Sequence, residues 1–453
     1  MKLYNTMSGQ KEEFVPARDP VRMYVCGVTP YAEAHMGHAM SYISFDVLRR
    51  YLEHRDYRVF HVQNFTDIDD KIIARAHLLG VSPSTLAETY IQQYEQQMAT
   101  LNILRASAYP RATLEIEKMQ EIISGLIAQG YAYGADGDVY FRIAAKADYG
   151  KLSGRSTDSL MAGARVDPDP RKENPLDFAL WKGAKEGEPA WPSPWGPGRP
   201  GWHIECSAMA LKYLGEEIDI HGGGQDLVFP HHENETAQSE AYTGHPFARY
   251  WLHNGLMQMG EEKMSKSLGN LIPVGEALER YGADALRIFV LSSHYRSPLT
   301  YSEEGLEGAQ RAAERLRLAA ELRGPVEGPD VLDPEAFRSR FLAAVDDDLG
   351  TPQALAALFD LAREINRARD EGRPIEAVQR ALREMASLLG LTLAPPALPA
   401  EIAPFVDLLV QVREDLRTAR QYDLADAIRA HLQEMDIALE DTPEGPRWRR
   451  HLG

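Results

Sequence analysis

The sequence predicts an α/β protein in which a parallel sheet is interrupted by an insertion and followed by a helical bundle and a small α+β domain. Three observations predict this order. A strand–helix–strand pattern lies near the N-terminus, a Trp/Pro/Gly-rich stretch precedes a later strand, and helical periodicity dominates from Glu303 onward. With 453 residues, the chain is long enough for roughly two to four domains.

The first pattern is typical of a βαβ unit. Residues 22–26 and residues 57–62 form short runs with strand composition. Between them, Phe45, Leu48 and Leu52 lie on one face of a predicted helix. Such units build parallel sheets that bind ligands at the carboxyl ends of their strands. Functional residues are therefore expected just after residue 26.

An insertion is expected over residues 112–193. It contains a strand-like run at residues 138–141 and leads into the Trp/Pro/Gly-rich stretch of residues 191–198. Residues 217–221 then indicate a strand of the main sheet that ends in the glycine run of residues 222–224. The helix predicted at the start of the insertion carries Met119, Ile122, Leu126 and Ile127.

The C-terminal third is predicted to be a helical bundle followed by a small domain. Residues 394–399 are rich in proline and form a candidate linker. Two helical stretches follow, and the turn at residues 442–445 predicts a short hairpin. The bundle pattern places Leu355, Leu358, Leu361 and Ile365 near one helix face.

Composition excludes several classes of protein. Hydrophobic residues make up 44% of the chain, and no run approaches the roughly 18 apolar residues of a membrane span. The N-terminus has no signal-peptide pattern, and two cysteines do not make a disulfide scaffold, so we expect a cytoplasmic protein without membrane contact. A net charge of -18 argues against a general polyanion coat, although a local basic patch remains compatible with nucleic acid.

The first candidate motif is His35 and His38, which follow the first strand and flank Gly37. A helix that starts here would offer backbone N–H groups to an anion, and two imidazoles could stabilise charge on a phosphate. The alternative is a pair of surface histidines beside an incidental glycine.

The second motif is the loop that carries Lys263 and Lys266. Two lysines in a small-residue loop can follow a triphosphate as its shape changes, whereas the alternative is a solvated basic turn. Together and in this order, the two motifs resemble the paired signatures of class I aminoacyl-tRNA synthetases. Residues 284–287, an Asp-Ala-Leu-Arg run, also match that superfamily.

The third constellation concerns a metal. Cys26 ends the first strand, Cys206 lies in a helical stretch, and His231 and Glu235 are four residues apart, as on one helix face. Two thiolates, one imidazole and one carboxylate would complete a tetrahedral zinc site. The alternatives are inert buried thiols or a zinc that only stabilises the fold.

These residues carry a closer resemblance, to bacterial cysteinyl-tRNA synthetases, and it covers nearly the whole chain. One departure is Pro30, where many members of that family have a β-branched residue. A proline there also resembles the mycothiol-pathway relative that ligates cysteine to an amino sugar, but that relative lacks a C-terminal RNA module. The matching segments are residues 23–27, 64–71, 201–209, 221–224 with Asp226, 229–235, 346–352, 439–443 and 448–450.

The resemblance implies a set of site residues. One zinc per chain would be bound by Cys26, Cys206, His231 and Glu235 and would meet the thiolate of the substrate cysteine. His35, His38, Lys263 and Lys266 would be catalytic. ATP would be bound by Thr29, His35, His38, Gly222, Gly223, Asp226 and Lys266, and cysteine by Gly27, Thr66 and Trp202. For the last three, a turn glycine, a helix-capping threonine and a core tryptophan are the alternatives.

The implied activity is cysteine–tRNA ligation. Mg·ATP would activate L-cysteine to cysteinyl-adenylate, and the terminal ribose of tRNA(Cys) would then accept the cysteinyl group, in a chain expected to be a monomer. The alternatives are cysteine ligation to an amino-sugar acceptor and an RNA-binding module with a relic nucleotide fold. The C-terminal Arg447, Trp448, Arg449 and Arg450 are the candidate tRNA contacts, although Trp448 would equally suit the core of a small domain.

The expected domains follow from the resemblance and from the patterns above. A Rossmann-type catalytic domain would be split by the insertion, and a small α+β domain would bind the anticodon. The expected ranges are 1–111 and 194–250 for the two catalytic halves, 112–193 for the insertion, 251–305 for the lysine-loop segment, 306–393 for the bundle and 401–453 for the anticodon-binding domain.

Overall fold

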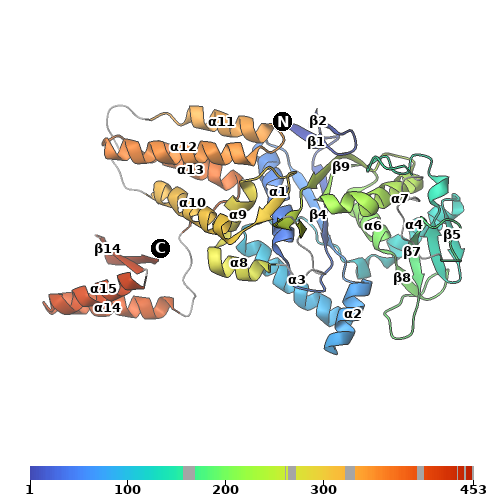
Figure 1. Cartoon of the computed structure of the whole chain (residues 1–453), viewed down its shortest axis with the longest axis horizontal. Helices are drawn as coiled ribbons and strands as arrows, with labels where there is room; N and C mark the ends of the chain where they lie inside the picture. Colours follow the sequence, from blue (N-terminus) through green and yellow to red (C-terminus); the bar gives the residue numbers. More distant parts are fainter. Residues whose placement is uncertain are drawn as a thin grey trace.

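The computed structural model describes residues 1–156, 169–260, 262–263, 272–321, 332–394, 402–435, 437–442 and 445–450. Figure 1 shows an α/β part that carries the insertion, a bundle of long helices beside it, and a pair of helices with a hairpin near the C-terminus. Among these residues, none of the helices combines the length and the apolar character needed to span a bilayer.

The main sheet is parallel and has the strand order β10-β9-β3-β4. Helix α1 (Met36–His54) connects β3 to β4, so the predicted βαβ unit is confirmed. The four strands are β3 (Val21–Val28), β4 (Val59–Phe65), β9 (Ile218–Gly224) and β10 (Ala248–Asn254).

Strand β9 includes the glycine run and ends with it at Gly224, as predicted. The glycines serve packing rather than turn formation. A Cβ atom on Gly222 would lie 2.2 Å from the ring of Phe45 in α1. Glycine therefore allows the helix to lie close against the strand while the strand keeps its pairing with β10.

The two faces of the main sheet belong to different hydrophobic cores. Met23 and Val25 point into the core shared with α1 and the bundle, whereas Tyr24 and Cys26 lie in the core shared with the insertion. Helices α8 (Val274–Tyr281) and α9 (Ala283–Leu291) contribute to the first core, and α4 (Ile116–Ala128), α6 (Trp202–Leu214) and α7 (Glu233–Thr243) contribute to the second.

The insertion is built on an antiparallel sheet with the order β5-β6-β7-β8. This sheet continues to Pro200, beyond the expected boundary at Ser193. Its strands are β5 (Ala132–Ala135), β6 (Asp138–Phe141), β7 (Phe178–Gly183) and β8 (Gly198–Pro200). As predicted, Met119, Ile122 and Leu126 of α4 are buried.

Smaller elements surround the main sheet. Strands β1 (Lys2–Asn5) and β2 (Gln10–Glu13) form an N-terminal hairpin beside β10. A second small sheet has the order β12-β11-β13. The remaining elements of this part are α2 (Asp70–Leu79), α3 (Pro83–Thr100), β11 (Met257–Met259), β12 (Glu262–Lys263) and β13 (Leu299–Tyr301).

One buried arginine makes several of the contacts that hold the bundle against the catalytic part. Arg287, in the Asp-Ala-Leu-Arg run of α9, donates to the backbone oxygens of Leu389 and Leu101 and forms an ion pair with Asp46 of α1. The bundle consists of α10 (Glu303–Glu321), α11 (Glu335–Asp346), α12 (Thr351–Asp370) and α13 (Glu376–Leu388). The predicted face of Leu355, Leu358, Leu361 and Ile365 is buried within it.

The C-terminal unit has a small core of its own. Helices α14 (Ala403–Thr418) and α15 (Tyr422–Glu434) precede an antiparallel hairpin of β14 (Ile437–Thr442) and β15 (Gly445–Arg450). The predicted hairpin is therefore confirmed, although residues 443–444 of its turn lie outside the described residues. The core of this unit contains Val406, Val410, Leu432, Ile437 and Leu439.

Candidate metal centre and active site

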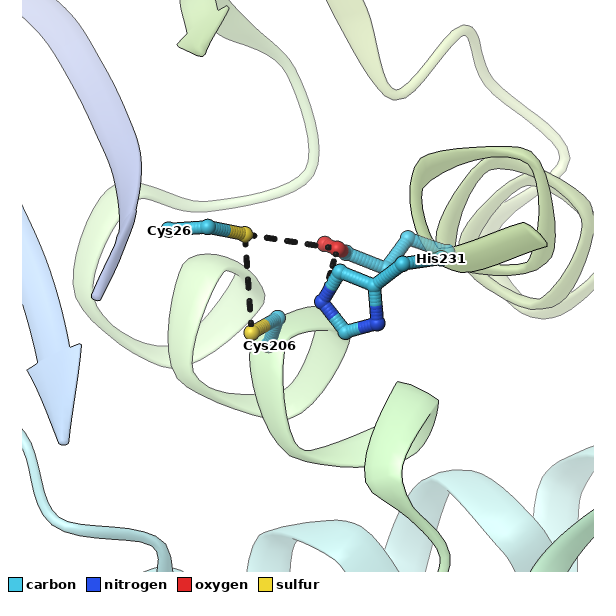
Figure 2. Close-up of side chains that lie close together, drawn as sticks. Cys26, Cys206 and His231 are labelled. Atoms are coloured by element: carbon cyan, nitrogen blue, oxygen red, sulfur yellow. Dashed lines mark hydrogen bonds and ion pairs between the residues drawn. The ribbon is translucent and has the colours of Figure 1, made fainter. Parts of the chain in front are cut away.

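Four side chains converge on the sheet face that α6 and α7 cover (Figure 2). The Sγ atom of Cys26 lies 3.8 Å from Sγ of Cys206 and 3.6 Å from Oε1 of Glu235. Nε2 of His231 lies 2.9 Å from the same Oε1 atom. All four residues are buried. The structure therefore brings together the four residues that the sequence suggests as metal ligands.

The position of Cys26 depends on the glycine that follows it. A Cβ atom on Gly27 would lie 1.6 Å from the backbone oxygen of Asn64, so only glycine allows this approach to β4. The Asn64 side chain accepts a hydrogen bond from the Gly27 N–H and donates one to the hydroxyl of Thr66. Gly27 and Thr66, both expected near the amino acid substrate, thus share one hydrogen-bonded strand end beside Cys26.

The remaining ligands come from two consecutive helical segments. Cys206 lies in α6, His231 lies in the short η4 segment (Val228–His232), and Glu235 lies in the first turn of α7. Trp202 begins α6 and stacks on the His231 ring, with the centroids 4.2 Å apart and an interplanar angle of 22°. Trp202 is 39% exposed, so the alternative of a core tryptophan is wrong.

The geometry of the cluster fits zinc. Two sulfur atoms bound to one tetrahedral zinc at ~2.3 Å would be about 3.8 Å apart. The two sulfur atoms of this chain have that separation without a disulfide bond between them. The donor set of two sulfurs, one imidazole nitrogen and one carboxylate oxygen is also one that zinc prefers. The residues present therefore fit the metal that the family resemblance implies.

Three further histidines surround the cluster, and the sequence reasoning missed them. Nε2 of His221 lies 2.9 Å from Oε2 of Glu235, and Nε2 of His232 lies 3.3 Å from Sγ of Cys26. Nδ1 of His232 in turn lies 2.7 Å from Nε2 of His253. Contacts of this kind orient metal ligands from outside the coordination sphere. Cys26, His221, His232 and Glu235 also form a second group close enough to hold an ion.

Burial and neighbouring groups change the pKa values of the candidate metal ligands. Burial raises the pKa of the Cys26 thiol well above its usual range. Burial also acts to raise the pKa of Cys206, but a hydrogen bond from Cys26 and the proximity of His231 lower it to about 6. Despite burial, the nearby His221 and His231 hold the pKa of Glu235 at about 2. The site therefore favours one thiolate and one carboxylate before any metal binds.

The two histidines of the first motif lie together at the start of α1. His35 is the N-cap residue, and its ring stacks on that of His38 with the centroids 3.8 Å apart. Burial and the neighbouring His35 lower the pKa of His38 well below its usual range, which favours a neutral imidazole. The start of α1 beside them presents the positive end of the helix dipole to an anion.

The other residues expected at the ATP site surround the same strand ends. Thr29 directly follows β3, whereas Gly222 and Gly223 form the last part of β9. Asp226 follows in the short η3 segment (Gln225–Leu227). These residues thus lie where parallel sheets bind their ligands.

The lysine loop and the C-terminal arginines are only partly described. Lys263 ends β12, and Lys266 lies outside the described residues. Trp448 lies in β15, contacts the small core and donates its indole N–H to Oδ1 of Asp407 at 2.7 Å. Trp448 therefore contributes to the core of the unit, which was one of the two alternatives. Arg447, Arg449 and Arg450 share the same strand.

Comparison with known proteins agrees with this fold. Residues 13–311 match the family model described as tRNA synthetases class I (C) catalytic domain, and residues 340–394 match a DALR domain. The fold is similar to that of Mycobacterium tuberculosis methionyl-tRNA synthetase in complex with methionyl-adenylate, with a TM-score of 0.60 at 18% identity over 87% of this chain and 94% of that chain. An Agrobacterium radiobacter LeuRS–tRNA–LeuAMS ternary complex gives a TM-score of 0.59 at 13% identity, over 84% and 85% of the two chains. The fold and the catalytic-domain match define a class I aminoacyl-tRNA synthetase.

Relatives with curated names specify the family. A cysteine–tRNA ligase from Dehalococcoides mccartyi is 59% identical over 99% of both chains. Cysteine–tRNA ligases from Carboxydothermus hydrogenoformans and Thermococcus onnurineus are 50% and 48% identical, each over 99% of this chain and at least 99% of the relative. The chain belongs to the cysteine–tRNA ligase family. An amino-sugar ligase is therefore not favoured.

Proposed function

We propose that this chain activates L-cysteine with Mg·ATP and transfers it to the 3′-terminal ribose of tRNA(Cys), using one zinc ion. The observation that carries the proposal is the buried cluster of Cys26, Cys206, His231 and Glu235 at the carboxyl end of β3. Family membership over the whole chain supports the same reaction. Two cysteine ligands select a metal that prefers sulfur, and such a metal can also bind the thiol of the substrate.

Discrimination between cysteine and serine requires more than shape, because the two side chains differ by one atom of similar size. When bound, zinc supplies a Lewis acid that lowers the pKa of a thiol and prefers sulfur to a hydroxyl oxygen. The residues of this chain hold the amino acid around that centre. Trp202 stacks on the His231 ring, and Gly27 allows β3 to lie close to Asn64 beside Cys26.

In the first step, a carboxylate oxygen of cysteine attacks the α-phosphorus atom of ATP. A new P–O bond forms, the bond to the bridging oxygen breaks, and pyrophosphate leaves with that electron pair. His35 and His38 at the N-terminus of α1 stabilise the charge on the phosphates, together with Lys263 and Lys266. No protein nucleophile is needed, because positioning and charge stabilisation supply the rate enhancement.

In the second step, a terminal ribose hydroxyl of tRNA attacks the carbonyl carbon of the adenylate. The new ester C–O bond forms, the acyl–phosphate bond breaks, and AMP leaves with the bonding electron pair while the hydroxyl proton is released. The small C-terminal unit would contact the anticodon through Arg447, Arg449 and Arg450. The bundle then acts as the spacer between the anticodon and the catalytic domain, in a cytoplasmic monomer.

Cysteine-dependent exchange of pyrophosphate into ATP tests the first step, and charging of total tRNA with each amino acid tests the second. We expect exchange with cysteine and not with serine, and charging of tRNA(Cys) alone. A zinc-loaded protein that catalyses neither reaction would contradict the proposal. Measurement of the zinc content of the same preparation, expected to be one ion per chain, separates a missing metal from a wrong function.

A further inference from the structure

A polar pocket of about 760 Å³ opens beside the metal centre. Apart from Asp226, a candidate ATP contact, and His253, its described lining residues have had no role so far. Three segments form it: the turn of the N-terminal hairpin at Thr6–Gly9, the insertion loop at residues 151–155, and residues 225–229 after β9. Its volume lies within the ~300–1,000 Å³ of sites that hold a small molecule or one of its groups.

The pocket reaches the metal centre through two histidines. His253 lines the pocket, and its Nε2 atom lies 2.7 Å from Nδ1 of His232. Nε2 of His232 lies 3.3 Å from Sγ of the metal-ligand candidate Cys26. A group bound in this pocket is thus separated from the metal centre by only the His253 and His232 side chains.

The charge of the pocket suits a phosphate backbone. The described lining residues of the pocket include three cations, Lys151, Arg155 and Arg296. They include one carboxylate, that of Asp226. This local excess of positive charge contrasts with the net charge of -18 of the whole chain. An acidic protein that binds RNA must do so at such local sites, because each bound phosphate needs a nearby cation.

Arg155 is the cation of the pocket that is available to a ligand. Lys151 forms ion pairs with Asp148 and Glu240, and Arg296 forms one with Asp348. Arg155 instead lies over the ring of Phe229, 4.8 Å from its centroid, and within the described part of the chain no carboxylate pairs with it.

The combination of a guanidinium and an aromatic ring is typical of sites for unpaired nucleotides. The ring can stack on a base, and the guanidinium can bind the adjoining phosphate. Phe229 and the metal-ligand candidate His231 belong to the same short segment, Val228–His232, so a base stacked on Phe229 would lie close to the metal centre.

The loop that carries these cations is fixed to the metal-binding helix. Glu233, at the start of α7, accepts hydrogen bonds from the backbone N–H of Gly150 at 2.9 Å and of Ser153 at 2.7 Å. Gly150 has a φ of +97°, and a Cβ atom there would lie 1.9 Å from the backbone oxygen of Arg155. The loop therefore keeps a defined position relative to Glu235, two residues along the same helix.

We propose that this pocket binds the 3′-terminal nucleotide of tRNA and presents its ribose to the activated cysteine. This inference rests on the proposed function. It places the binding site for the 3′ end of tRNA at residues outside the C-terminal unit. Arg155 and Phe229 bind this nucleotide, and Glu233 is a positioning residue that holds the loop.

The test compares Arg155→Gln with Lys185→Gln, a matched charge removal at a side chain of the insertion that is 73% exposed and outside the pocket. Binding of tRNA with and without its 3′-terminal nucleotide is measured by titration. We expect the wild-type protein and Lys185→Gln to bind the complete tRNA about tenfold more tightly than the shortened one, the effect of one stacked base. Arg155→Gln should lose most of this difference.

Two kinetic measurements accompany the titration. Arg155→Gln should raise the KM for tRNA or slow single-turnover transfer from preformed cysteinyl-adenylate, whereas cysteine-dependent exchange should keep its wild-type rate. Equal loss of exchange and transfer would overturn the proposal, because the pocket would then serve the adenylate. Unchanged binding of both tRNA forms by Arg155→Gln would also overturn it. A wild-type protein could bind the complete tRNA more tightly than the shortened one and yet charge neither. That result would contradict the proposed function and leave the pocket proposal standing.

Discussion

The guanidinium of Arg287 lies 2.5 Å from Oδ2 of Asp46, and both side chains are fully inaccessible to solvent. This ion pair joins α9 to α1, the helix whose start carries the two histidines of the proposed phosphate site. Arg287 also donates to the backbone oxygen of Leu389 at the end of the bundle helix α13. One side chain therefore links the catalytic sheet to the bundle.

The first prediction concerns this arginine. Arg287→Met should lower the free energy of unfolding by about 2–4 kcal/mol, because it leaves two buried backbone oxygens without a donor and leaves Asp46 with Arg50 as its remaining arginine partner. Urea denaturation measures the change. Arg280→Met is the matched control, since Arg280 forms an exposed pair with Glu303 one helix earlier and should change stability little. Equal effects of the two substitutions would contradict the structural role of Arg287.

The second prediction concerns Gly390, which follows the bundle helix. Gly390 has a φ of +70°, and a Cβ atom there would lie 2.0 Å from Nη2 of Arg287. Gly372 has the same φ and nothing within 4 Å, so Gly372→Ala should cost only the backbone strain of about 1 kcal/mol. Gly390→Ala should cost clearly more. In a double-mutant cycle, Arg287→Met should reduce the additional cost of Gly390→Ala, and strict additivity would refute the clash.

The third prediction concerns metal content. His231→Ala should reduce the zinc content of the purified protein well below one ion per chain, because it removes one of four ligands. His245→Ala, at a histidine that is 64% exposed and outside both candidate metal groups, should leave the content unchanged. Elemental analysis after dialysis provides the measurement. Full zinc content in His231→Ala would show that this imidazole is not a ligand.

The fourth prediction separates a catalytic metal from one that only stabilises the fold. Cys206→Ser should weaken cysteine binding and the discrimination against serine more than it weakens ATP binding, because the phosphate site at α1 is built from other residues. Exchange kinetics with varied cysteine, serine and ATP measure the three effects. If cysteine affinity and discrimination stayed at wild-type values, the metal would have a structural role or be absent.

The fifth prediction concerns the C-terminal unit. A cut at Asp441 would remove β15 and open the small core that Trp448 contacts, so the whole unit, residues 402–453, should be removed instead. The shortened protein should retain cysteine-dependent exchange and show a raised KM for tRNA. Thermal unfolding checks that the catalytic part is intact. Wild-type charging kinetics in the shortened protein would contradict the anticodon assignment.

Local sequence patterns predicted much of the fold. Phe45, Leu48 and Leu52 share a helix face, and the strand runs beside them have the composition that parallel sheets require, so the βαβ unit could be found without tertiary information. The reason for the glycines at the end of β9 could not be found in this way. Only the position of the Phe45 ring shows why glycines continue the strand.

The residues of the candidate site were also predicted only in part from the sequence. Cys26 and Cys206 drew attention because cysteine is rare in this chain, and His231 and Glu235 because of their helical spacing. His221 and His253 had no such signal. They lie in different strands, and only strand pairing brings them to the metal centre. The pocket around Arg155 was missed for the same reason, since its three segments are distant in sequence.

The wide spacing of the four metal-ligand candidates has a consequence for the synthesis of the protein. Cys26 and Glu235 are 209 residues apart, and the insertion lies between them. During translation the Cys26 thiol therefore emerges long before its partners, and the full set of ligands exists only when both halves of the sheet have been made and joined. Metal loading through this set is thus a late event in folding. Under the proposed function, an incomplete chain would lack the centre that selects the amino acid, and it would therefore have no means to direct ATP to cysteine.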